Sequence, residues 1–347
     1  MRLGLIPETV VERIGMRLGV ATPAAMTEPY APLYARALVL ATELGVFDAI
    51  GPGGLAAPAV AAACGTHPRA TERLLNLLVT MRYLAYRNGT YHLTRESDPW
   101  LLRQPPGSIR DLVLMKRLEW RWIEGLDDYL RSGTPLEVHD TMSPEDWGAY
   151  QRGMRAQANI AAPRLARILP VPKGARDVLD IGGSHGYFSV VLCRRHPGLQ
   201  ATVLDLPDAV AQVTPILERE GMGDRVVLRA GNALTDDLGT DAYDLILMFS
   251  LVHHFDDASN RTLVARAADA LRPGGRMIIL EALRPKPGGG QLGAFFDLYF
   301  GMTSESGTWT LAEMAAWQTA AGLEPQRQPF VLRFVTDIGL AIADKPR

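Results

Sequence analysis

Hydrophobic positions recur at helical spacing through the first third of the chain. Tyr30–Ile50 has this periodicity and ends at a run of glycine and proline, which predicts a helix. Thr66–Met81 predicts a second amphipathic helix, crowded with leucine. Tyr83–Leu93 alternates and turns at Asn88-Gly89, the signature of a β-hairpin. Helices followed by a small hairpin predict a winged-helix-like N-terminal domain.

Beyond a Pro- and Gly-rich linker at 170–174, short apolar strands alternate with helices. The segments are Asp177–Ile181, Gly186–Arg195, Ala201–Asp205, Ala209–Glu220, Val226–Ala230, Tyr243–Phe249, Arg261–Leu271 and Arg276–Leu280. This alternation predicts an α/β fold with a doubly wound parallel sheet. Phe330–Asp344 predicts an edge hairpin that turns near Thr336-Asp337.

The change of pattern predicts three parts of the chain. Residues 1–105 form a helical, winged-helix-like dimerisation domain, and 106–170 form a helical linker whose aromatic residues contribute to a substrate pocket. Residues 171–347 form the ligand-binding catalytic domain. At 347 residues the chain is long enough for this organisation.

Charge bears on what the winged-helix-like part binds. The chain holds 36 Lys and Arg against 38 Asp and Glu, a net charge of −2, so it carries no overall electrostatic footprint for nucleic acid. A DNA-reading helix needs basic residues, yet Thr66–Met81 offers little beyond Arg69 and Arg73. We therefore expect a dimerisation or lid module, with DNA contact as the alternative.

Two cysteines, Cys64 and Cys193, cannot build a disulfide framework or a cysteine-based zinc site. The first residues lack the apolar core of a signal peptide, and the apolar runs are too short to cross a bilayer. We expect a soluble, cytoplasmic protein with no membrane partner.

The segment DVLDIGGSHGYF, residues 177–188, reads as a strand, a glycine turn and a helix start. Gly182 and Gly183 permit positive φ and close approach of a ligand, and Gly186 permits close packing of the helix on the sheet. Asp180 stands at the strand end, where it would repel a pyrophosphate and attract an ammonium group. The turn therefore disfavours a dinucleotide.

Asp205 ends the second strand, at about the spacing of an acid that binds a ribose diol. A diol and an ammonium group without a phosphate describe S-adenosylmethionine. The alternative for Asp205 is a helix cap before Leu206-Pro207. Asn232, after the third strand, would contact adenine or hold its own turn.

The fourth strand runs into Leu251–Asp257 and the fifth ends in Glu281. Adjacent strand ends would bring Glu281 to His253, which could act as a general base for a hydroxyl acceptor. The alternatives are a structural histidine and a solvated strand terminus. Side chains of neighbours His253 and His254 should diverge, which argues against a metal pair, and Asp256 and Asp257 should cap the next helix.

These motifs, with VLDLP and ALRPGGRMIILE, resemble the small-molecule O-methyltransferases of the plant caffeic-acid type and their bacterial relatives in antibiotic and polyketide tailoring. The resemblance implies a homodimer with a Rossmann-like class I methyltransferase domain. It implies His253 as the base, Glu281 as the first of two acids flanking it, and Met154 between acceptor and donor, with Tyr150 one helical turn earlier. From spacing alone that Tyr/Met pair could equally be core.

On this resemblance the predicted contacts divide into two sets. The S-adenosylmethionine contacts are Asp180, Gly182, Gly183, Asp205, Leu206, Asn232, Ala233 and Ser250, and the acceptor contacts are Tyr150, Met154, His254 and Phe296.

Three departures from the family pattern stand out. Ser184 replaces the third glycine of the turn, and His254-Phe255 replaces the Asp-Trp that usually follows the base. The second flanking acid falls near Thr308, with Glu305 close but offset.

The sequence therefore predicts an S-adenosylmethionine-dependent O-methyltransferase acting on a hydroxyl of an aromatic or polyketide-type molecule in secondary metabolism. The alternatives are N- or C-methylation on the same fold and, in another class, a winged-helix regulator that senses S-adenosylmethionine.

Overall fold

The computed structural model describes residues 9–19, 26, 28–103, 107–327 and 337–347. The chain forms two compact units, Met1–Arg117 and Leu118–Arg347. The boundary falls inside helix α6, Arg110–Ile123, within the segment 106–170 that the sequence sets apart as a linker.

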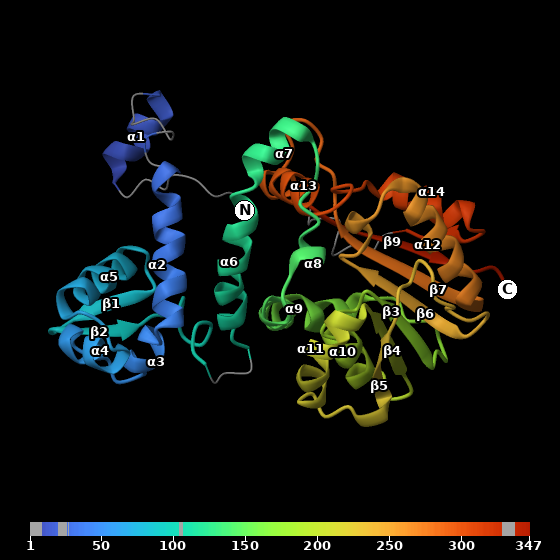
Figure 1. Ribbon diagram of the computed structural model, residues 1–347, viewed down its shortest axis with the longest axis horizontal. Helices are drawn as coiled ribbons and strands as arrows, with labels where there is room; N and C mark the ends of the chain where they lie inside the picture. The colour runs from blue at the N-terminus through green and yellow to red at the C-terminus, as the bar shows by residue number, and fades with distance from the viewer. Residues whose placement is uncertain (1–8, 20–25, 27, 104–106, 328–336) are drawn as a thin grey trace. The chain divides into compact units, whose positions relative to one another are not determined.

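The first unit has the order of elements predicted for a winged-helix-like domain (Figure 1). Its elements are α1 Val10–Leu18, the 3₁₀ turn η2 Glu28–Tyr30, α2 Ala31–Glu43, α3 Val46–Ile50, α4 Ala57–Cys64, α5 Pro68–Thr80, β1 Leu84–Arg87 and β2 Thr90–Leu93. The helix predicted over Tyr30–Ile50 is two helices, because Gly45 adopts φ +77° between α2 and α3. Asn88 and Gly89 both have positive φ, as the predicted hairpin turn requires.

The second unit is built on a seven-stranded sheet in the order β5-β4-β3-β6-β7-β9-β8 (Figure 1). The strands are β3 Asp177–Ile181, β4 Gln200–Asp205, β5 Val226–Ala230, β6 Tyr243–Phe249, β7 Leu271–Ala282, β8 Glu324–Pro325 and β9 Ile338–Asp344. Strands β3 to β7 pair in parallel, which confirms the doubly wound sheet, and β9 is antiparallel to β7 and β8. Residues 328–336, with most of the first strand and the turn of the predicted edge hairpin, lie outside the described residues.

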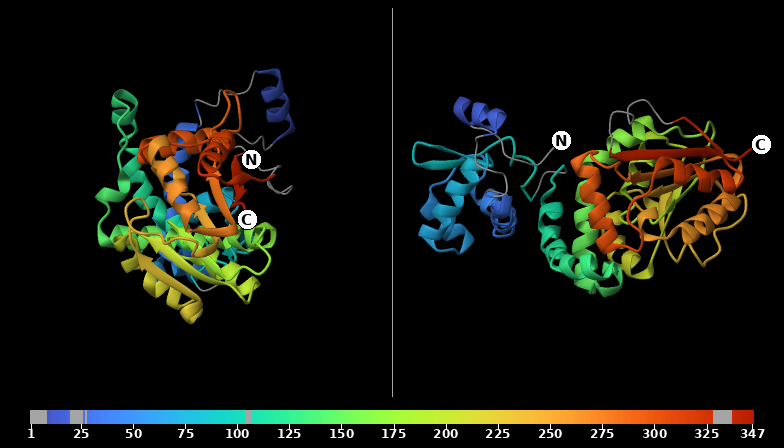
Figure 2. Two further views of the ribbon diagram at one scale, coloured as in Figure 1. Left: turned by 90° about the vertical axis from the view of Figure 1, so that its right-hand side faces the viewer. Right: turned by 90° about the horizontal axis from the view of Figure 1, so that it is seen from above.

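Helices cover both faces of this sheet (Figures 1 and 2). The helices that begin in this unit are α7 Leu126–Ser132, α8 Val138–Thr141, α9 Pro144–Ile168, α10 Tyr187–Arg195, α11 Pro207–Glu218, α12 Asp257–Ala270, α13 Gln291–Thr303 and α14 Leu311–Ala320, with the 3₁₀ turns η3 Gly223–Arg225 and η4 Val252–His254. Alternate strand residues serve opposite faces: Val178 packs in the core beneath α9, α10 and α11, and Leu179 in the core beneath α12 and α14. Strands buried on both faces explain their nearly continuous apolar sequence.

The strand order reverses between β3 and β6, since β4 and β5 lie to one side of β3 and β6 and β7 to the other. In open α/β sheets the carboxyl ends of the strands flanking such a point form a ligand crevice. Asp180, Asp205, Asn232 and His253 all lie at or just beyond these ends. Over the described ranges, no helix combines the length and apolar character needed to cross a bilayer.

Candidate active site

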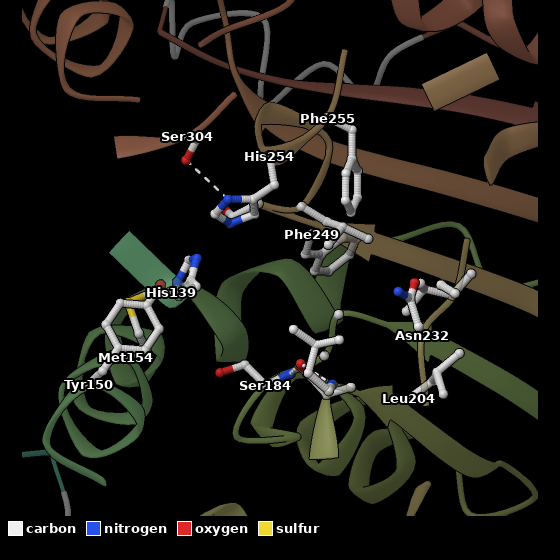
Figure 3. Close-up of a pocket in the computed structure, with 18 of the residues that line it drawn as sticks. His139, Tyr150, Met154, Ser184, Leu204, Asn232, Phe249, His254, Phe255 and Ser304 are labelled. Carbon is white, nitrogen blue, oxygen red and sulfur yellow. Dashed lines mark hydrogen bonds between the residues drawn. The ribbon is translucent and has the colours of Figure 1, made fainter. Parts of the chain in front are cut away.

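A cavity of about 500 Å³ opens at this edge of the sheet. Its wall comes from the turn after β3, the ends of β4, β5 and β6, helices α8 and α9, and residues 303–305 after α13. Figure 3 shows His139, Tyr150 and Met154 on one side of it and Leu204 and Asn232 on the other. The predicted acceptor contacts Tyr150 and Met154 and the predicted donor contact Asn232 therefore lie across the cavity from one another.

The glycine turn brings bare backbone to the cavity. Gly182 has φ +64°, and a Cβ there would lie 2.6 Å from Leu251. Gly183 has no such φ, but its Cβ would lie 2.6 Å from the Asp180 carboxyl carbon and 2.7 Å from Val203. Both positions thus require glycine. Gly182 needs it for its positive φ and for space, and Gly183 needs it for space alone.

Asp180 is 1% exposed, and its Oδ2 accepts a hydrogen bond of 2.7 Å from the Ser189 hydroxyl. Burial raises the pKa of this carboxyl to about 7, with Asp205 raising it further and Ser189 opposing the shift. A buried acid with one neutral donor gains much from a cation beside it. That property fits the predicted ammonium group of the donor.

Asp205 organises the turn as well as facing the cavity. Its Oδ2 accepts the Ser184 N–H at 2.7 Å, and its Oδ1 accepts the Leu206 N–H at 2.8 Å. Helix α11 has no side-chain cap at its N-terminus, so the helix-cap alternative fails. Each carboxylate oxygen accepts a single bond here, which leaves acceptor capacity for a diol.

Ser184, in place of the usual third glycine, adopts φ +51°. Its hydroxyl pairs with the side-chain carbonyl oxygen of Gln151 on α9. This left-handed backbone conformation costs a serine roughly 1 kcal/mol. The side-chain contact links the turn to α9, the helix that carries Tyr150 and Met154.

Asn232 confirms the alternative in which its side chain holds its own turn. Its Oδ1 accepts the Leu234 N–H at 2.9 Å, so the side chain holds its turn, and the residue also lines the cavity. Leu206, Ala233 and Ser250 line the cavity as well. The eight residues predicted to hold the donor are thereby brought together.

His253 and Glu281 meet as predicted from their strand ends. His253 Nδ1 lies 3.0 Å from Glu281 Oε2, and Glu281 Oε1 accepts the Ala282 N–H at 2.9 Å. Both are buried, so Glu281 is not a solvated strand terminus. His253 stacks on Phe300, with ring centres 3.8 Å apart, and is not among the described residues that line the cavity. The predicted base His253 therefore does not face the cavity directly.

His254 does line the cavity, and the expected divergence of its side chain from His253 is wrong. The two rings lie 4.1 Å apart, because η4 coils the chain where an extended strand would send neighbours to opposite faces. His254 Nδ1 lies 3.0 Å from the Ser304 hydroxyl (Figure 3). Within the described ranges no cluster of His, Cys, Asp or Glu could hold a metal ion. Asp256 caps α12 through the Ser259 N–H, as predicted. Asp257 does not cap the helix; it pairs with Arg261 and accepts from Trp317 Nε1.

The acceptor side is aromatic. Tyr150 and Met154 both line the cavity, and Trp147 and Gln151 extend the same face of α9. Phe296 is not among the described lining residues; it stacks on Phe300 at 5.5 Å instead. It lies one helical turn from Phe300 on α13, which explains why the two rings pack on each other.

Thr308 and Glu305, the two positions considered for the second flanking acid, lie in different environments. Thr308 is buried and bonded to Asp297, whereas Glu305 lines the cavity from an exposed position. Neither has an interaction with His253 among those the structure shows. His253 is therefore described with one carboxylate partner, Glu281.

Sequence reasoning missed several lining residues: His139, Trp147, Gln151, His185 and Ser304. Trp147 and Gln151 follow from the helical spacing that joins them to Tyr150 and Met154. His139 lies on the four-residue helix α8, too short to leave a periodic signal. His185 accepts the Tyr187 N–H through Nδ1, a local turn contact that no spacing rule predicts.

Comparison with known families gives two matches. The O-methyltransferase domain matches residues 124–324, and the O-methyltransferase dimerisation domain matches residues 33–103. The two segments fall largely in the second and first structural units, respectively.

Individual relatives point the same way. A 3-hydroxy-5-methyl-1-naphthoate 3-O-methyltransferase of Streptomyces sahachiroi is 28% identical over 305 residues, covering 84% of this chain and 86% of the relative. An L-tyrosine C(3)-methyltransferase of Streptomyces lavendulae is 25% identical over 305 residues, covering 82% of each chain. The crystal structure of human N-acetylserotonin methyltransferase in complex with S-adenosylmethionine shares the fold, with a TM-score of 0.81 at 21% identity over 93% of this chain and 97% of that one.

Proposed function

Because this chain belongs to the O-methyltransferase family, we propose that it transfers a methyl group from S-adenosylmethionine to a hydroxyl of an aromatic or polyketide-type small molecule. The observation that carries the proposal is the division of the cavity. Asp180 and bare glycine backbone line it from the end of β3, whereas Tyr150 and Met154 line it from α9. The family relation and the naphthoate-methylating relative support an aromatic acceptor.

The donor side suits S-adenosylmethionine, which supplies an electrophilic methyl group on a sulfonium. Asp180 would face the ammonium group, and Asp205 would accept hydrogen bonds from the ribose diol. Gly182 and Gly183 let the chain approach the donor closely, and Asn232 and Leu206 flank the adenine. None of these groups needs to move a proton during the transfer, so their task is to orient the donor in line with the acceptor oxygen.

We assign proton removal to His253. The carboxylate of Glu281 accepts from His253 Nδ1–H, which leaves the lone pair on Nε2. Glu281 is itself fixed by the Ala282 N–H and stabilises the imidazolium that forms. His253 would take the hydroxyl proton as the oxygen attacks the methyl group. Because His254 lines the cavity and lies against His253, with ring centres 4.1 Å apart, the acceptor would have to reach the His253 ring past that neighbour.

The relative that methylates carbon 3 of L-tyrosine supports a second candidate, C-methylation of a phenol. The same base would serve it, because removing the phenolic proton places negative charge on the ring carbons as well as on the oxygen. The two functions differ only in which atom faces the methyl group.

The test is product structure. Purified enzyme is incubated with methyl-¹³C S-adenosylmethionine and a panel of hydroxyaromatic and aminoaromatic compounds, and the labelled atom is located by NMR. Boiled enzyme is the control. Label on oxygen supports the proposal, label on ring carbon supports the second candidate, and label on nitrogen contradicts both. Feeding the host labelled methionine and identifying the labelled metabolite tests the place in secondary metabolism.

A further inference from the structure

We propose that His139 and His254 form a neutral imidazole pair that binds the acceptor and selects molecules whose polar edge is uncharged. The group bound is a hydroxyl or carbonyl oxygen additional to the hydroxyl that is methylated, and a carboxylate at this place is rejected. The proposal rests on the proposed function and adds the chemical class of the acceptor to it.

The pair is built from two separate segments. His139 on α8 stacks on Trp147 with ring centres 5.3 Å apart and meets the Tyr150 ring edge-on at 5.4 Å. His254 on η4 is held through Nδ1 by the Ser304 hydroxyl. The His139 and His254 rings meet edge-on at 4.8 Å, and Figure 3 shows His139 beside Met154 and Tyr150, with His254 farther from them and bonded to Ser304. Packing therefore fixes both rings at the acceptor side.

Their remaining nitrogens have no protein partner. Within the described ranges nothing bonds to His254 Nε2 or to either nitrogen of His139, and both residues line the cavity. In the described part of the chain, the polar side-chain atoms that are both fully buried and without a hydrogen bond are Arg110 Nε, Asn260 Oδ1 and Gln318 Oε1. The three imidazole nitrogens are not among them, so they are not fully buried. Three imidazole nitrogens thus remain accessible for a ligand.

Charge decides which ligand they fit. Burial, together with the positive charge that His253 would carry, lowers the pKa of His139 to about 4 and the pKa of His254 well below its usual value. Both rings are therefore neutral near pH 7, and each can donate or accept a hydrogen bond.

The described residues that line the cavity give an anion no Lys or Arg partner. They include the acids Glu137, Asp140 and Glu305. A carboxylate entering here would lose hydration without gaining a cation, whereas an uncharged oxygen needs only a hydrogen-bond partner. This separates the chain from its naphthoate-methylating relative, whose named substrate carries a carboxylate.

The experiment measures acceptor binding to the enzyme saturated with S-adenosylhomocysteine, by calorimetry near pH 7.5. The probes are 2,3-dihydroxynaphthalene and 3-hydroxy-2-naphthoate, which share a ring system and differ in charge. Wild type should bind the neutral probe about 10-fold more tightly or better. His139→Phe and His254→Phe should each weaken neutral-probe binding by about 10-fold. His196→Phe, a histidine outside the cavity, should change nothing.

A gain-of-charge variant and kinetics complete the test. His139→Arg should raise binding of 3-hydroxy-2-naphthoate and reverse the preference. With the neutral probe as acceptor, both Phe variants should raise KM and leave kcat within about 3-fold. Equal or tighter binding of the carboxylate by wild type, binding of neither probe, unchanged binding by the Phe variants, or a loss confined to kcat would each overturn the inference.

Failure of the proposed function would look different. The enzyme would then fail to bind S-adenosylhomocysteine in the first titration, or would bind it and place no methyl on oxygen. If the enzyme binds S-adenosylhomocysteine tightly and prefers 3-hydroxy-2-naphthoate, only the inference on the imidazole pair is defeated.

Discussion

Asp180 shows how far burial alone can tune a single side chain. Near pH 7 its carboxyl is divided between its protonated and ionised forms, because burial raises the pKa to about 7. Only the ionised form attracts an ammonium group. Below pH 7, binding of the donor must first release the proton, so affinity should fall by up to about 10-fold for each pH unit.

Calorimetry with S-adenosylhomocysteine between pH 5.5 and 8.5 measures this dependence. The affinity should rise with pH and level off above about 7 to 8. Asp180→Asn, which cannot ionise, should bind weakly with little pH dependence in that range. A flat profile in the wild type would show that Asp180 does not meet the ammonium group.

The second residue-scale prediction concerns the proposed base. His253→Ala should lower kcat by about 10²–10⁴-fold, the usual worth of a positioned general base. It should leave S-adenosylhomocysteine affinity intact, since the donor is held by Asp180 and Asp205. Glu281→Gln should give a smaller loss, because it orients the imidazole without carrying the proton.

Two controls separate chemistry from folding. His253→Asn keeps a polar side chain beside Phe300 and should lose as much turnover as His253→Ala. The second control is the affinity for S-adenosylhomocysteine, which should be unchanged in both variants. Near-normal turnover in them would assign the transfer to positioning alone or to an acceptor that is already ionised.

The positions of site residues at strand ends were predictable, whereas the side-chain directions of His253 and His254 and the presence of His139 at the cavity were not. Asp205 is the last residue of β4, and Asp180 and Glu281 are the next-to-last residues of β3 and β7. Parallel strands bring these ends to one edge of the sheet. His253 and His254 lie in a 3₁₀ turn, where the rule of alternating side chains does not hold. His139 reaches the cavity only through the tertiary placement of α8.

At the scale of elements, the turn from β3 to α10 fixes the donor side. Gly183→Ala should weaken S-adenosylhomocysteine binding by 10-fold or more, because the new Cβ would press on the Asp180 carboxyl and on Val203. Gly198→Ala is the matched control: no atom lies within 4 Å of its Cβ, and its φ is not strained. Equal affinity of the two variants would mean that the turn does not shape the donor site.

Helices and strands with strong local sequence signals were predicted correctly, but a break within one of the predicted helices was not. The Asn88-Gly89 hairpin and the strands β3 to β7 follow from turn chemistry and apolar runs. The break at Gly45 escaped, because a single glycine within an apolar periodic stretch is compatible with one helix or two. The antiparallel direction of β9 depends on a connection that has no local signature.

At the scale of the whole molecule, the first unit presents an apolar surface. Helix α1 has no buried residue, and Val11 and Leu18 are 80% and 70% exposed. Leu33 on α2 is 63% exposed. In the leucine-crowded helix α5, Leu75 and Leu78 fill the core of their own unit and cannot face a second protomer. We therefore assign the dimer contact to α1 and α2.

The match of residues 33–103 to a dimerisation domain supports a dimer contact on the first unit and includes most of α2, whereas the assignment of α1 rests on its exposed apolar residues. Sedimentation at micromolar concentration should report twice the chain mass of 37.9 kDa. Val11→Glu combined with Leu33→Glu should give a folded monomer, because charges on exposed positions spoil an apolar contact between copies without entering the core. Val227→Glu, at an exposed position on the edge strand β5, is the matched control and should remain dimeric. A wild type that sediments at 37.9 kDa would refute the dimer, and a dimeric double variant would move the interface away from α1 and α2.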